Sequence, residues 1–141
     1  MQLHRLTEQL SVAAQISPQD LAELAAAGFR SVINNRPDGE APDQPTSEQM
    51  AAAAAKQGLA YRYLPVTPGQ LTDERAAEFS RALREMPAPV LAFCRTGTRS
   101  TSMWALQATD DADGVLGIAR NAGCDLEALR SRLPSTRRHN G

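Results

Sequence analysis

Short apolar runs and helically spaced apolar residues alternate along the chain. Residues 29–34, 59–66 and 90–93 read as strands, and the last of these runs is apolar at every position. Helical spacing follows in segments such as the one with Ala76, Phe79, Leu83 and Met86 on one face. This alternation predicts an α/β fold, in one domain with a central, mostly parallel sheet flanked by helices. Because 90–93 is apolar on both faces, we expect it inside the sheet.

Capping residues set the ends of the predicted helices. Ser17 with Pro18 opens the first helix, and Gly28 ends it. Thr46 pairs with Gln49 in a capping box that opens the second. A third helix follows Thr72, further helices are expected over 100–108, 115–121 and 126–133, and a strand is expected over 6–12. We expect a domain over 1–133 and a disordered tail over 134–141.

The turn after residues 90–93 carries the strongest chemical signal. Cys94 stands between the strand and the following helix, where backbone N–H groups and the helix dipole favour an anion. Gly97 lets the backbone turn tightly. The neighbouring Arg95 and Arg99 should favour the thiolate form of Cys94. The alternative is a buried, inert cysteine, which has no need of these neighbours.

Composition narrows the classes of function. The chain has 141 residues and a net charge of −1, so nothing indicates nucleic acid or an anionic membrane as a partner. No apolar stretch approaches the roughly 20 residues that span a bilayer, and we expect a cytoplasmic protein. With two cysteines and two histidines, no metal-ligand spacing exists, and we expect no cofactor. A redox pair of Cys94 and Cys124 stays open.

Loops at the carboxyl ends of parallel strands meet at one edge of the sheet. We therefore expect residues 35–40, 67–70 and 94–99 to lie together. In the first of these loops, Asp38 and Arg36 would face Cys94, although both also fit a solvated turn.

Three segments together are distinctive. They are the run 29–40, the segment 61–70 with Leu64-Pro65-Val66-Thr67, and the loop Cys94-Arg95-Thr96-Gly97-Thr98-Arg99-Ser100. Over residues 3–133 the chain closely resembles the phosphatase-like domain of β-lactamase-hydrolase-like proteins. This resemblance implies a fold like that of dual-specificity and tyrosine phosphatases. Some relatives carry a fused metallo-β-lactamase-fold domain of the persulfide dioxygenase type, so a partner sulfur-oxidising enzyme is expected.

The resemblance implies roles for the loop residues. Cys94 becomes the nucleophile that attacks a small anionic substrate, a phosphomonoester, and forms a cysteinyl-phosphate. Arg99 becomes the bidentate anion clamp, and the backbone of residues 95–99, with Arg95, Thr96, Gly97 and Thr98, becomes the cradle. Ser100 would hydrogen-bond the thiolate or serve as a plain helix residue. Arg36 becomes an accessory anion contact.

The chain departs from the phosphatase pattern in three ways. The usual motif is histidine, cysteine, five residues and arginine, whereas here Phe93 replaces the histidine and Arg99 comes one residue early. Where the family pattern delivers an acidic proton donor, the chain has Val66-Thr67-Pro68. Asp38 is the better substitute, because Asp73 fits as the first-turn acid of the helix that Thr72 caps.

The short loop also resembles the active-site loop of rhodaneses, which carry a cysteine persulfide. Sulfur transfer needs a thiolate and a positive loop but no proton donor. A sulfurtransferase is therefore the alternative function, with a sulfane-sulfur donor as substrate. A non-catalytic anion-binding or redox-sensing module, in which Cys94 is oxidised, is the second alternative.

Overall fold

The computed structural model describes residues 1–134. A five-stranded sheet has the order β1-β2-β5-β3-β4, in which β1 is antiparallel to β2 and all other neighbours are parallel. The strands are β1 (Leu3–Arg5), β2 (Leu10–Ala13), β3 (Ser31–Asn34), β4 (Ala60–Tyr63) and β5 (Val90–Phe93). Strand β5 lies at the centre, so the predicted interior position and the predicted α/β class are both confirmed.

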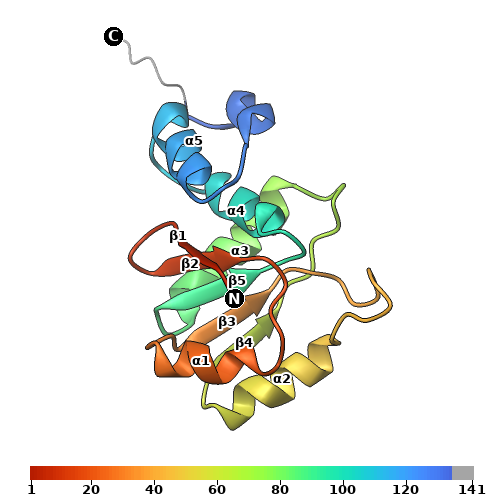
Figure 1. The fold of residues 1–141 in the computed structure, drawn as a ribbon. Coiled ribbons are helices and arrows are strands. Elements are labelled where there is room, and N and C mark those ends of the chain that lie inside the picture. The colour runs from red at the N-terminus through yellow and green to blue at the C-terminus, as the bar shows by residue number, and fades with distance from the viewer. Residues whose placement is uncertain (135–141) are drawn as a thin grey trace.

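Helices cover both faces of the sheet (Figure 1). Helices α1 (Asp20–Ala26) and α2 (Ser47–Lys56) lie on one face. Helices α3 (Asp73–Glu85), α4 (Thr98–Ala105) and α5 (Ala112–Asn121) lie on the other, followed by the 3₁₀ helix η1 (Glu127–Arg132). The central strand therefore has no solvated face, which explains its continuous apolar run.

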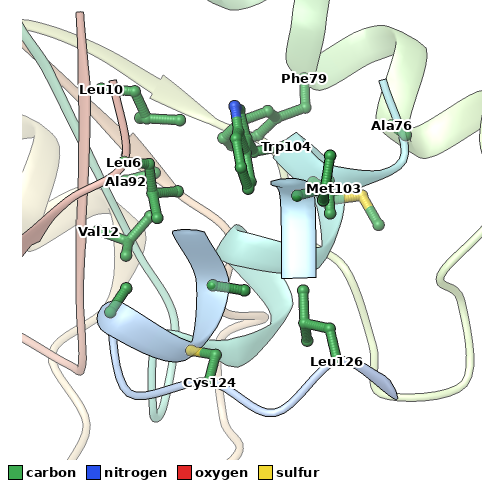
Figure 2. Close-up of a cluster of buried hydrophobic side chains, with 14 of the residues drawn as sticks. Leu6, Leu10, Val12, Ala76, Phe79, Ala92, Met103, Trp104, Cys124 and Leu126 are labelled. Carbon is green, nitrogen blue, oxygen red and sulfur yellow. The ribbon is translucent and has the colours of Figure 1, made fainter. Parts of the chain in front are cut away.

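Two hydrophobic clusters flank β5, because successive side chains of a strand point to opposite faces. Leu91 and Phe93 pack with the α1 and α2 residues. Val90 and Ala92 pack in the other cluster, with buried side chains of α3, α4 and α5. Figure 2 shows part of this second cluster. The two clusters fix the direction of β5, and with it the place where the chain leaves the sheet after Phe93.

The start of the chain differs from the prediction of one strand over 6–12. It forms a hairpin of β1 and β2, and only residues 10–12 of the expected strand are extended. Thr7 explains the break, because its Oγ1 accepts hydrogen bonds from the N–H groups of Gln9 and Leu10 at 3.1 and 3.0 Å. Such a hydroxyl turn competes with strand pairing.

The predicted caps of α2 and α3 are confirmed. Thr46 and Gln49 form a reciprocal capping box at α2, and Thr72 accepts a hydrogen bond from the N–H of Arg75 at α3. Helix α4 begins two residues before the predicted start at Ser100, so the helix N-terminus lies closer to Cys94 than expected. The carbonyl of Pro134 accepts a hydrogen bond from Ala112, and the rest of the predicted tail, 135–141, lies outside the described residues.

Within residues 1–134, no helix is both long and apolar enough to cross a membrane. The same part of the chain holds no group of three or more His, Cys, Asp or Glu side chains that could bind a metal ion.

Candidate active site

Cys94 is fully buried and directly follows β5, in the turn that leads into α4. Gly97 precedes the helix with φ of 93°, a left-handed conformation that side chains disfavour. In this conformation its N–H donates a hydrogen bond to Cys94 Sγ at 3.1 Å. The backbone of the loop therefore turns back onto the sulfur, as the sequence led us to expect.

The end of β2 holds this loop in place. The N–H of Cys94 donates to the carbonyl of Ala13, and the N–H of Gln15 donates to the carbonyl of Arg95 at 3.2 Å. A Cβ added at Gly97 would lie 3.5 Å from the backbone of Ala13. The loop is thus fixed by parallel pairing of β2 with β5 as well as by its own turn.

Arg99 reaches from the first turn of α4 to the loop after β3. Its Nη1 and Nη2 donate to the two carboxylate oxygens of Glu40 at 2.7 and 2.9 Å. Its Nη1 also donates to the carbonyl of Val66 at 2.9 Å. The Arg99 side chain is only 11% exposed, so this bidentate ion pair is largely shielded from solvent. The hydrogen bonds with Glu40, and next the charge of Cys94, raise the pKa of the Arg99 guanidinium against the opposing effect of burial.

Glu40 also binds Arg36, which donates from Nε to Glu40 Oε1 at 3.0 Å. The Nη1 of Arg36 donates to Gln15 Oε1, also at 3.0 Å. The hydrogen bond from Arg99, followed by that from Arg36, lowers the pKa of the Glu40 carboxyl, although burial acts against this. Arg36, predicted as an accessory anion contact, therefore lies in the same network as Arg99.

Asp38 is exposed, and its Oδ1 accepts a hydrogen bond from the N–H of Ser47 at 2.8 Å, at the start of α2. Its own N–H donates to Tyr63 Oη. The second carboxylate oxygen, Oδ2, makes no hydrogen bond within residues 1–134. The role of Asp38 as a proton donor stays a prediction. Asp73 begins α3 and forms an ion pair with Arg132.

Ser100 is buried in α4, and its hydroxyl donates to Asn35 Oδ1 at 2.8 Å. The amide of Asn35 in turn donates to the carbonyl of Leu64. These two bonds join α4 to the ends of β3 and β4. The hydroxyl proton of Ser100 is thus directed to Asn35 in this structure, and not to the thiolate that we expected as one option.

The remaining cradle residues form the outer rim. Arg95, Thr96 and Thr98 are exposed, and the hydroxyl of Thr96 donates to that of Thr98 at 3.1 Å. Beside the rim lies a cavity of about 190 Å³, lined in part by His4, Gln15 and Thr96. The β1–β2 hairpin, which the sequence did not reveal, thus forms one wall next to the loop.

Of the three loops expected to meet, residues 35–40 and 94–99 do so through Glu40 and Arg99. The third loop, 67–70, does not take part in this contact; the further hydrogen bond of Arg99 is made with the carbonyl of Val66, just before that loop. Glu40 and Gln15 were missed as site residues. An acidic residue in a loop predicted to face two arginines was a usable signal for Glu40, whereas Gln15 carried none.

The family comparison can now be added to this geometry. Residues 2–110 match the model of the family described as beta-lactamase hydrolase-like protein, phosphatase-like domain. The chain belongs to this family. It is 35% identical over 130 residues to a beta-lactamase hydrolase-like protein of Xylella fastidiosa, covering 89% of this chain and 30% of the relative. A protein of the same description in Agrobacterium fabrum is 38% identical over 106 residues, covering 75% of this chain and 25% of that relative.

Solved structures agree with this assignment. A "putative phosphatase" from Neisseria meningitidis is 30% identical, with a TM-score of 0.86 over 94% of this chain and 96% of the other. The phosphatase-like fold extends to more distant proteins, such as PTPMT1, with a TM-score of 0.64 at 16% identity over 93% of both chains. The chain is therefore a phosphatase-like domain that spans less than a third of the length of its curated relatives.

Proposed function

We propose that this protein is a cysteine-dependent hydrolase of phosphomonoesters that works through a cysteinyl-phosphate intermediate. The observation that carries the proposal is the convergence near one sulfur of a backbone donor, a helix N-terminus and a partly buried arginine. Gly97 donates to Cys94 Sγ, and Arg99 is near enough for the charge of Cys94 to raise its pKa. Such a cradle favours an anion next to a nucleophile.

The reaction has two steps. The Cys94 thiolate attacks phosphorus, an S–P bond forms, and the ester P–O bond breaks with its electron pair on the leaving oxygen. Water then attacks phosphorus, the S–P bond breaks, and inorganic phosphate leaves while the thiolate is restored. Both steps build negative charge on the phosphoryl oxygens, which the loop N–H groups and Arg99 stabilise.

Glu40 holds Arg99 ready for this task. A guanidinium has five N–H donors. Within residues 1–134, Glu40 accepts two of them and the carbonyl of Val66 a third, which leaves two N–H groups of Arg99 for the Cys94 sulfur and a substrate anion. A guanidinium fixed before the substrate arrives loses little conformational entropy on binding it.

Asp38 is the residue proposed to protonate the leaving oxygen. Its Oδ1 is engaged at α2, but Oδ2 is not used within residues 1–134, so one carboxyl oxygen is available for a proton. The cavity beside Thr96 would receive the rest of the substrate. Its volume of about 190 Å³ favours a small alcohol or phenol as the leaving group.

A sulfurtransferase is the second candidate, favoured by the tight hydrogen bond from Gly97 to the sulfur and by the binding of Asp38 at α2. In that reaction the Cys94 thiolate attacks the outer sulfur of thiosulfate, forms a persulfide and releases sulfite. The persulfide then passes its outer sulfur to an acceptor thiol. This route needs no proton donor.

Steady-state kinetics with two substrates separate the candidates. Phosphate release from 4-nitrophenyl phosphate that is abolished in Cys94→Ser supports the hydrolase. Thiocyanate formation from thiosulfate and cyanide, together with no phosphate release from 4-nitrophenyl phosphate, would contradict the hydrolase and support the sulfurtransferase. A Cys124→Ser variant is the control for general loss of a thiol, and it should keep the activity.

A further inference from the structure

A second cavity lies at the other end of α4, away from the catalytic loop. It has a volume of about 270 Å³ and is formed by α3, the end of α4, the segment after it, α5 and the β1–β2 turn. Apolar side chains make most of its wall, among them Phe79, Leu83, Met103 and Ile118. None of the residues 94–99 lines it. This cavity is therefore separate from the proposed phosphatase site.

Trp104 brings a polar group to the cavity, whose other polar lining residues are Thr7, Ser80, Gln107, Thr109 and Asp110. The side chain is more than nine-tenths buried, at 8% exposure, and it lines the cavity. Within residues 1–134, the indole N–H donates to no acceptor. The indole nitrogen is not fully buried either. Among the described residues, Gln44 Oε1 is the only fully buried side-chain nitrogen or oxygen atom without a hydrogen-bond partner. The indole nitrogen is therefore within reach of solvent, and Trp104 lines the cavity.

Figure 2 shows how the Trp104 indole lies among its neighbours. The indole stands beside Phe79, and its nitrogen lies on the side away from Cys124 and Leu126. A buried indole N–H usually has a hydrogen-bond partner. A mostly apolar cavity with a few polar groups, here the Trp104 indole N–H and the side chains of Thr7, Ser80, Gln107, Thr109 and Asp110, has the composition of a small-molecule site.

The charges around the cavity restrict the ligand. Asp110 is the one charged residue among those that line it, and no lysine or arginine does so. An anionic ligand would lose its hydration next to a carboxylate without any compensating cation. A neutral acceptor, such as a carbonyl oxygen, avoids that cost. The volume lies just below the roughly 300–1,000 Å³ of pockets for drug-sized ligands, which favours a smaller molecule.

We propose that this cavity binds a small, uncharged, mainly apolar molecule whose carbonyl oxygen accepts a hydrogen bond from the Trp104 indole N–H. The site is independent of the chemistry at Cys94. It also differs from the proposed substrate cavity beside Thr96, with which it shares no lining residue.

Nuclear magnetic resonance tests this directly, because the chain has one tryptophan and hence one indole N–H signal. The ¹⁵N-labelled full chain is titrated with acetophenone and with 2-phenylpropene, which has the same shape but no acceptor. Acetophenone should move the indole proton downfield in a saturable manner. It should bind roughly 2–10-fold more tightly than 2-phenylpropene, the difference that one hydrogen bond makes.

Three variants complete the test. Ala108→Phe fills the cavity from its partly exposed rim and should abolish the saturable shift, whereas Ala26→Phe on α1 should leave it unchanged. Trp104→Phe should remove the preference for acetophenone, measured on the Ile118 methyl signals. Equal binding of the two probes to the unmodified protein, a shift that does not saturate, or a shift that survives in Ala108→Phe would overturn the proposal.

Discussion

Arg99 and Glu40 lie 59 residues apart and form two hydrogen bonds, at 2.7 and 2.9 Å, between a guanidinium and a carboxylate. The pair joins the first turn of α4 to the loop after β3. The orientation of the Arg99 side chain is therefore fixed by a residue of a distant loop, Glu40, and not by the catalytic loop alone. The same carboxylate binds Arg36, so one acidic residue holds two arginines, of which Arg99 lies near Cys94.

Replacing Glu40 tests this organisation. Glu40→Gln keeps the shape but loses the charge, and we expect kcat/KM for the Cys94 substrate to fall roughly 10–100-fold, the scale of one charged hydrogen bond. Inhibition by orthophosphate should weaken in parallel, since both depend on Arg99. Glu85→Gln is the matched control, because Glu85 pairs with Arg62 on the exposed surface. An equal effect of the two changes would contradict a positioning role for Glu40.

The two arginines of the loop should differ in importance. Arg99→Lys keeps a charge but loses the bidentate geometry, so we expect a loss of about 2–4 kcal/mol of transition-state stabilisation. Arg95 is exposed, and Arg95→Ala should lower kcat/KM by less than about five-fold. Steady-state kinetics of both variants on one substrate measure the difference. A larger loss in Arg95→Ala than in Arg99→Lys would show that Arg95, and not Arg99, is the anion clamp.

Asp38→Asn tests the proposed proton donor. The asparagine Oδ1 can still accept the hydrogen bond from Ser47, so α2 should keep its start. Turnover of an alkyl phosphate should fall about 10²-fold or more, because its leaving oxygen needs a proton. Turnover of 4-nitrophenyl phosphate should fall far less, because its leaving group is stable as an anion. Equal changes for the two esters would remove Asp38 from the mechanism.

Acid should weaken the fold through Glu40. The pKa of its carboxyl lies below the ordinary 4.5, so the unfolded chain takes up the proton first as the pH falls. The stabilisation by Glu40 is therefore fully present above pH 4.5 and is lost as the pH drops through the lowered pKa. Urea unfolding of the unmodified protein and of Glu40→Gln should show a stability difference that shrinks below pH 4.5. A difference that stays constant down to pH 2 would be evidence against this linkage.

Much of the fold was predictable because its signals are local. The continuous apolar run at 90–93 predicted the central strand, and the Thr46 and Gln49 pair predicted the start of α2. The hairpin at residues 3–13 was not, because it depends on a hydroxyl turn at Thr7 in an otherwise strand-like segment.

The site was predictable in part for the same reason. Cys94 and Gly97 lie within one loop, and the sequence placed their turn correctly. The loop that holds the partners of Arg99 and Ser100 was predicted to face Cys94, but the pairing of Glu40 with Arg99 and of Asn35 with Ser100 was missed, because that loop lies about 60 residues away. Which side chain in that loop makes the contact depends on the register between β3 and β5, which the sequence does not display.

Mass spectrometry of Cys94 tests the central claim most directly. The protein is incubated with 4-nitrophenyl phosphate, quenched in acid and digested, and a parallel sample is incubated with thiosulfate. The account predicts one added phosphoryl group on the peptide with Cys94 in the first sample and its absence in Cys94→Ser. An unmodified Cys94 after the phosphate ester, together with one added sulfur atom after thiosulfate, would contradict the hydrolase and establish the sulfurtransferase instead.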